Sequence, residues 1–258
     1  MRVARAAGTL GRFTIAEAFF SKVGLAALLI LLAGLLLGQF AAQLALTDSA
    51  GIRVSMQAAL YRLAAVFLVA GFTVASVVRE HNDKSLELML SLPIPRGGYL
   101  AGKWLGCAGT ALIIAALFTG PLVFDAAPGA AFAWGLSLGL ELILVASASL
   151  LCVLTISHVV ASLAAVAAFY VLARSVGALL AIGASPVAPI DSTAYQAANW
   201  TLHAISTVLP RLDLFTRTAW LTGDAPASVD LPMVSLQTLI YVVLLVGSAF
   251  FDLSRKNV

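Results

Sequence analysis

The stretch VGLAALLILLAGLLLGQFAAQLAL, residues 23–46, decides the fold because it contains no charged side chain. A hydrocarbon core about 30 Å thick needs roughly 20 apolar residues in a helix that rises about 1.5 Å per residue. Five further apolar runs of similar length follow, at residues 57–78, 101–124, 130–154, 159–183 and 233–251. Their composition favours helices over the strands of a barrel. The sequence therefore predicts an all-α polytopic membrane protein with six transmembrane helices.

The overall composition agrees with this fold class. Of the 258 residues, 61% are hydrophobic and 10% are charged, whereas soluble chains are about half apolar and a quarter charged. Cys107 and Cys152 both lie inside apolar runs, where they act as small hydrophobic residues. A soluble, disordered or disulfide-stapled protein is thereby excluded. Basic residues before residue 23 are typical of a signal peptide, but the apolar run is too long and lacks a cleavage site, so we expect a retained span.

The distribution of lysine and arginine predicts the orientation. Loops on one side of the predicted membrane hold ten of these residues, and loops on the other side hold only Arg53, Arg211 and Arg217. By the positive-inside rule, the basic side is cytoplasmic. Both termini and residues 79–100 are therefore expected in the cytoplasm. This topology accounts for the basic excess, so we expect no nucleic-acid partner, while an anionic-lipid patch at the N-terminal arginines stays open as an alternative.

The segment before the first span, residues 1–22, mixes arginines with aromatic side chains such as Phe13 and Phe20. This mixture predicts an interfacial amphipathic helix, weakened in its first turns by Gly8 and Gly11. The whole chain, residues 1–258, is expected to form a single transmembrane domain.

An external loop is predicted at residues 184–232, and it is too long to lack structure in a compact domain. Apolar residues recur among polar ones within its middle part, and Pro210 divides them. We therefore expect two short interfacial helices that meet at Pro210, with Trp200 and Trp220 at headgroup level.

The most informative cytoplasmic stretch is REHNDKSLELMLSLPIPRGGYLAGK, residues 79–103. Asp83 or Ser85 can cap the start of a helix, and Pro93 ends that helix after about two turns. Leucine and methionine side chains then form more apolar surface than a short exposed helix can leave in water. They are expected to be covered by the chain's own helices, by the lipid interface or by another protein.

The amino-acid sequence of this stretch resembles that of ABC type-2 exporter permeases. The matching features are an acidic residue at the helix exit, the segment SLELMLSLP at 85–93, Pro95 with Arg96, and YLAGK at 99–103. The resemblance implies a coupling helix that docks into a separate ATP-binding subunit, with apolar anchors, a proline that fixes the exit angle, and Arg96 and Lys103 as donors. The implied coupling residues are Glu80, Ser85, Leu86, Glu87, Met89, Leu90, Pro93, Arg96 and Lys103.

The same resemblance implies which proteins bind this chain and which of them hydrolyses ATP. Two ATPase subunits and a second permease chain, identical or different, are expected beside membrane lipid, and the loop at 184–232 is open to a periplasmic partner. The sequence has no Gly-x-x-x-x-Gly-Lys-Ser/Thr loop. The chain is therefore expected to be non-catalytic and to bind no cofactor or metal, while ATP and Mg²⁺ belong to the partner. A bacterial inner-membrane location is expected.

Three charged residues lie inside the apolar runs and away from the ends of those runs: Arg62, Glu141 and Arg174. Such residues are costly in hydrocarbon and usually face protein or water in pairs. Glu141 and Arg174 both lie about 20 Å from the cytoplasmic ends of their runs at 1.5 Å per residue. They are predicted to form an ion pair, either structural or part of a gate. Arg62 is expected near an outer end, from which it reaches the interface.

Three other functions are alternatives to an ATP-driven permease. Gly135-Leu136-Ser137-Leu138-Gly139 matches the Gly-x-Ser-x-Gly pattern, and rhomboid proteases also have six spans, but no histidine lies in the last span to act as base. An ion-driven secondary transporter usually has repeats and more intramembrane acids. A scaffold subunit without a transport path is the third alternative.

Overall fold

The computed structural model describes residues 2–46, 48–83, 96–184, 193–223 and 231–255, and this part of the chain contains no strand. Six of its helices are long and apolar enough to cross a membrane. They are α2 (Lys22–Leu44), α3 (Ser49–Asn82), α5 (Arg96–Asp125), α6 (Pro128–Ile156), α7 (Val159–Ala184) and α10 (Leu231–Arg255). The predicted all-α fold with six spans is confirmed.

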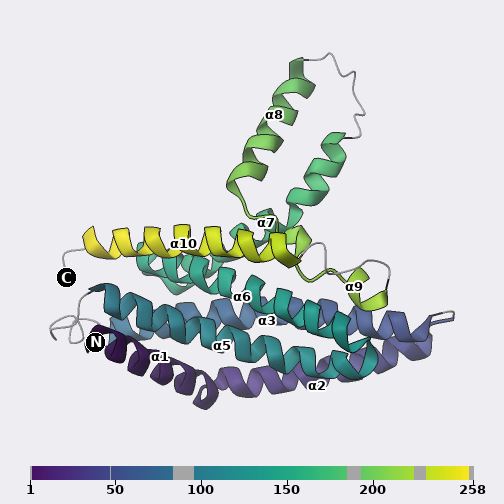
Figure 1. The fold of residues 1–258 in the computed structure, drawn as a ribbon, viewed down its shortest axis with the longest axis horizontal. Coiled ribbons are helices and arrows are strands. Elements are labelled where there is room, and N and C mark those ends of the chain that lie inside the picture. Colours follow the sequence, from purple (N-terminus) through teal and green to yellow (C-terminus); the bar gives the residue numbers. More distant parts are fainter. Residues whose placement is uncertain (1, 47, 84–95, 185–192, 224–230, 256–258) are drawn as a thin grey trace.

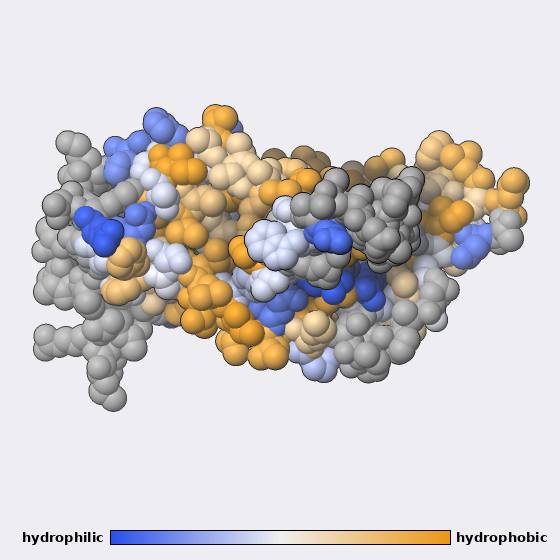
Figure 2. Space-filling view, turned by 90° about the horizontal axis from the view of Figure 1, so that it is seen from above, coloured by the Kyte–Doolittle hydropathy of each residue, from blue (hydrophilic) through white to orange (hydrophobic). Residues whose placement is uncertain are grey.

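The long helices α2, α3, α5, α6 and α10 run along one common axis, and both termini lie at the same end of the bundle (Figure 1). Helix α6 is the most buried of the six, because it packs against α3, α5, α7 and α10. Helices α2 and α10 are the least buried and form the periphery. Figure 2 shows hydrophobic residues over much of the bundle, hydrophilic residues at the end that carries the termini, and a second hydrophilic group farther along the bundle. This distribution is that of a bundle whose middle lies in lipid.

The N-terminal segment forms helix α1 (Arg2–Phe20), and the helix continues without interruption through Gly8 and Gly11. Helix α1 packs along α5. The packing is close because a Cβ at Gly106 would lie 2.4 Å from the Cβ of Thr14. Small residues on both helices therefore allow the two backbones to approach. The chain then turns at Ser21, which caps the start of α2.

The outer segment differs from the prediction. Helix α8 (Thr193–Val208) ends before Pro210, but only a 3-10 turn, η1 (Leu212–Leu214), and a four-residue helix, α9 (Ala219–Thr222), follow. Trp200 is 75% exposed, whereas Trp220 is only 2% exposed. The second interfacial helix was therefore a wrong prediction. Its apolar side chains pack into the bundle, which buries more apolar surface than an interfacial position would.

Helix α8 and the C-terminal part of α7 lie side by side and project away from the bundle (Figure 1). The two helices contact each other, and the chain returns to the bundle through η1, which packs against α7. Gly177 of α7 permits this contact, since a Cβ there would lie 2.3 Å from a carboxylate oxygen of Asp213. The outer loop is thus ordered in two parts, a projecting helix and an inserted turn.

Candidate functional site

Two buried groups of polar side chains stand out, and the first lies at the ends of α3 and α5 on the side predicted to be cytoplasmic. Glu80, near the end of α3, accepts hydrogen bonds from the Tyr99 hydroxyl at 2.6 Å and from the Lys103 ammonium at 2.5 Å. Both donors lie on α5, one turn apart. Since residues 84–95 connect α3 with α5, this pair of contacts joins the two helices at the base of the predicted coupling segment.

The same group of contacts extends to the N-terminal helix. Lys103 also donates to the hydroxyl of Ser76 at 2.7 Å, and Ser76 donates to Glu17 of α1 at 2.9 Å. The other oxygen of Glu17 pairs with Arg79 at 3.3 Å. These six residues form the cytoplasmic network: Glu17, Ser76, Arg79, Glu80, Tyr99 and Lys103. The network ties α1, α3 and α5 together.

Lys103 is the most buried member of the cytoplasmic network, with 0% exposure. An ammonium group removed from water is costly unless an opposite charge and hydrogen bonds compensate it, and Glu80 and Ser76 supply both. In this conformation Lys103 is not available as a surface donor to a partner chain, in contrast to the direct contact implied by its family resemblance. Any part it has in coupling acts through Glu80.

The remaining predicted coupling residues are not brought together by the described structure. Arg96 is the first residue of α5. The other members lie outside the described residues, so their roles stay predictions: Ser85, Leu86, Glu87, Met89, Leu90 and Pro93. Sequence reasoning missed Glu17 and Ser76. Two features of the sequence could have indicated them: Glu17 is the single carboxylate within residues 2–20, and Ser76 is a polar residue near the end of the apolar run 57–78.

The second group surrounds Glu141, which is fully buried in α6. One of its oxygens accepts a hydrogen bond from the Tyr170 hydroxyl at 2.9 Å and lies 3.6 Å from a guanidinium nitrogen of Arg174. Its other oxygen accepts a hydrogen bond from the Thr216 hydroxyl at 2.8 Å. The structure therefore brings Glu141 and Arg174 together, as the equal depths of the two residues predicted.

Arg174 also holds the inserted outer turn against the bundle. One of its nitrogens donates to the carbonyl oxygens of Leu212 at 2.5 Å and Phe215 at 3.0 Å. The next backbone N–H, that of Thr216, donates to the hydroxyl of Ser137 at 3.0 Å. Thr216 is buried and has a φ of 46°, a left-handed conformation that is uncommon for a β-branched residue. These contacts hold the outer turn, residues 212–216, against α6 and α7.

Arg62 does not reach the outer interface, so that prediction was wrong. Helix α3 begins at Ser49, before the expected start at residue 57, so Arg62 lies about 20 Å from the outer end. Its guanidinium instead points to the carbonyl oxygen of Thr216 at 3.5 Å. The central cluster is thus Arg62, Ser137, Glu141, Tyr170, Arg174 and Thr216. It combines two guanidinium groups with one carboxylate.

Both groups hold helices, and the central cluster also holds the outer turn, through hydrogen bonds and ion pairs. Ser137 accepts a hydrogen bond from a backbone N–H, and it lies in the central cluster rather than on a nucleophile elbow. Among the residues that the structure describes, no group of histidine, cysteine and acidic side chains could hold a metal ion.

Comparison with known proteins points to one family. A family model described as "ABC-2 family transporter protein" matches residues 24–251. The matched range covers all six spans, apart from the first residues of α2 and the last residues of α10. A search of curated proteins gives no match.

Proposed function

The chain belongs to the ABC-2 transporter family, and from this premise we propose that it is the permease subunit of an ATP-driven exporter. In this proposal a separate ATPase subunit binds residues 84–95 and hydrolyses ATP with Mg²⁺. The permease itself makes and breaks no covalent bond and binds no cofactor. We place it in the inner membrane of a bacterium.

The observation that carries this proposal is the cytoplasmic network. It fastens α3 to α5 at the two ends of the proposed coupling segment, through Glu80 and Lys103, and it fastens both to α1 through Ser76 and Glu17. A force applied to residues 84–95 therefore acts on three helices held together by buried hydrogen bonds. A lever needs this rigidity, because a flexible attachment would absorb the motion of the ATPase locally.

The proposed mechanism is a shift between two arrangements of the bundle. Closure of the ATPase dimer on ATP moves residues 84–95, and α1, α3 and α5 follow as a unit relative to α6 and α7. Nucleotide can drive this shift only by as much as it binds the two arrangements with different affinity. Export, rather than uptake, follows from the resemblance to exporters and belongs to the same proposal.

The central cluster is the proposed outer gate. It holds the turn around Phe215 in the bundle by two hydrogen bonds: Arg174 of α7 donates to the Phe215 carbonyl oxygen, and the Thr216 N–H donates to the Ser137 hydroxyl of α6. Release of the substrate would require these contacts to separate. The cluster joins α3, α6 and α7, so movement of α3 at the cytoplasmic end would reach it.

The second permease chain, identical or different, is proposed to pack beside the projecting pair of α7 and α8. Exposed apolar side chains on α8 support a membrane or protein contact, with Trp200 75% and Val208 74% exposed. Two ATPase subunits and two permease chains would then form the complete exporter. A periplasmic partner at 184–232 is the alternative use of the same surface.

Affinity purification from native membranes tests this function. The tagged full chain is expected to bring down an ATP-binding subunit, and deletion of residues 85–92 is expected to release it while the chain remains monodisperse in detergent. A deletion variant that keeps the subunit would contradict the proposal. Vanadate-sensitive ATP hydrolysis by the isolated chain would contradict it as well.

A further inference from the structure

A cavity of about 450 Å³ lies beside the turn between α1 and α2. Its walls come from the end of α1, the start of α2 and the cytoplasmic part of α3. The lining residues that matter here are Glu17, Phe20, Lys22, Phe72, Ser76 and Arg79. None of the proposed functions uses this cavity, although three of its residues belong to the cytoplasmic network.

The cavity lies at the cytoplasmic boundary of the predicted membrane. Lys22 is the first residue of the span α2, and Arg79 lies near the cytoplasmic end of the span α3. Phe20 is 93% exposed at the same level. Aromatic and basic side chains at this depth face the lipid headgroups on one side and the upper acyl chains on the other.

The charges around the cavity are not balanced. Lys22 is exposed and has no hydrogen-bond or ion-pair partner among the residues that the structure describes. The Arg79 side chain is 59% exposed, and a single nitrogen contacts Glu17 at 3.3 Å. Both oxygens of Glu17 are occupied, one by Arg79 and one by Ser76. Two cations therefore face one carboxylate, and one further negative charge would neutralise the site.

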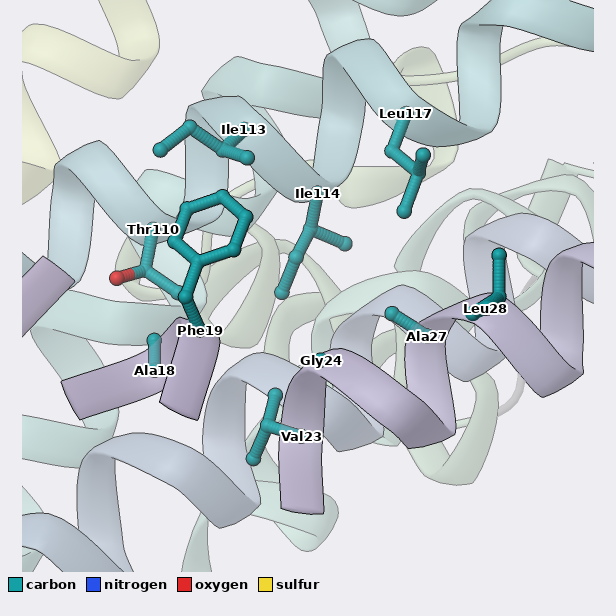
Figure 3. Close-up of a pocket in the computed structure, with 10 residues that line it drawn as sticks. All are labelled: Ala18, Phe19, Val23, Gly24, Ala27, Leu28, Thr110, Ile113, Ile114 and Leu117. Carbon is teal, nitrogen blue, oxygen red and sulfur yellow. The ribbon is translucent and has the colours of Figure 1, made fainter. Parts of the chain in front are cut away.

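The opposite side of the same turn has a different character. There an apolar pocket of about 280 Å³ separates the turn from α5, with side chains such as Phe19, Val23, Ile114 and Leu117 around it (Figure 3). In the part of the chain that the structure describes, no charged side chain lines this pocket. Val23 borders both cavities. The turn thus offers hydrocarbon contacts on one side and a charged cavity on the other. A phospholipid at this depth has an acyl chain and a charged headgroup that match the two sides.

We propose that the charged cavity binds the phosphate of an anionic phospholipid from the cytoplasmic leaflet. Lys22 and the free nitrogens of Arg79 would face the phosphate, while Phe20 and Phe72 would lie against the glycerol and the first methylene groups. Basic pockets on the cytoplasmic side of helix bundles suit anionic headgroups. A phosphodiester with a single net charge balances the cavity, and a zwitterionic lipid leaves the excess cation unneutralised.

Lipid binding to the purified full chain tests the site. Phosphatidylglycerol and phosphatidylcholine are titrated separately, and native mass spectrometry counts the lipids that the chain retains. Loss of one interfacial cation weakens attraction to an anionic lipid by about fivefold. Lys22→Gln is therefore expected to lower phosphatidylglycerol binding about fivefold and to leave phosphatidylcholine binding unchanged. Glu17→Gln, which keeps the hydrogen bond from Ser76, is expected to raise phosphatidylglycerol binding by a similar factor.

Arg12→Gln supplies the matched control, because Arg12 is an exposed cation on α1 that does not line the cavity. It is expected to bind phosphatidylglycerol like the unaltered chain. An equal loss in this control would overturn the site in favour of general attraction to the basic surface. Equal binding of both lipids by the unaltered chain would overturn it too, and so would displacement of phosphatidylglycerol by inorganic phosphate at the same concentration, since the proposed ligand is a lipid.

Discussion

Single buried charges govern both polar groups of the bundle. Lys103 has no exposed surface and depends on Glu80, and Glu141 likewise depends on its donors. Loss of one partner leaves the other charge buried without compensation, which is more costly than the pair itself is stabilising. Individual substitutions should therefore have large effects at these positions and small effects at exposed charges nearby.

Lys103→Met is expected to destabilise the chain strongly, by about 3 to 5 kcal/mol, because it breaks the buried ion pair with Glu80. Thermal unfolding in detergent, followed by tryptophan fluorescence, measures the effect. Lys22→Met is the matched control, since it removes the same charge from an exposed position. The role of the cytoplasmic network would be contradicted if both variants unfolded at the temperature of the unaltered chain.

Exchange of the two charges in the central cluster is expected to fail. A glutamate at position 174 cannot donate to the carbonyl oxygens of Leu212 and Phe215, and an arginine at position 141 would face Arg62. The variant Glu141→Arg/Arg174→Glu should therefore assemble no better than Arg174→Gln. Recovery of expression and monodispersity in the exchanged variant, measured by size-exclusion chromatography, would show that the ion pair alone matters and that the turn contacts do not.

The helices differ in how well the sequence predicted them. All six spans follow from apolar runs that are long enough to cross a bilayer. The turn around Phe215 was misplaced because its spacing of apolar residues suits either headgroups or a protein interior. The central cluster draws its members from α3, α6, α7 and the outer turn. The equal depths of Glu141 and Arg174 in their runs predicted that these two residues pair. No pattern in the sequence indicates that Tyr170 or Thr216 also belongs to the cluster.

Packing of α1 on α5 gives a prediction about a whole element. Gly106→Ala is expected to push α1 away from α5, because the new methyl group would lie 2.4 Å from the Cβ of Thr14. Gly120→Ala on the same helix meets no atom within 4 Å, so it is expected to leave stability unchanged or to raise it slightly. Limited proteolysis of the N-terminal helix measures the difference, and equal cleavage rates in both variants would contradict this packing.

The whole molecule combines two polar groups at different depths with an apolar surface between them. The cytoplasmic network holds the base of the proposed coupling segment, and the central cluster holds the outer turn. Helix α3 contributes to both, through Glu80 and Arg62. A movement that begins at residues 84–95 therefore has one continuous helix through which it can reach the outer turn.

Site-specific cross-linking tests the central claim, that a separate ATPase drives this chain through residues 84–95. A photo-reactive side chain is introduced at Leu86 or Met89 in the full complex, with Leu36 on the lipid-facing surface of α2 as the control position. We expect covalent products with the ATP-binding subunit from Leu86 and Met89 only, and a yield that changes when ATP and vanadate trap the closed state. Products that join these positions to the chain's own helices, with none to the ATPase, would contradict the account.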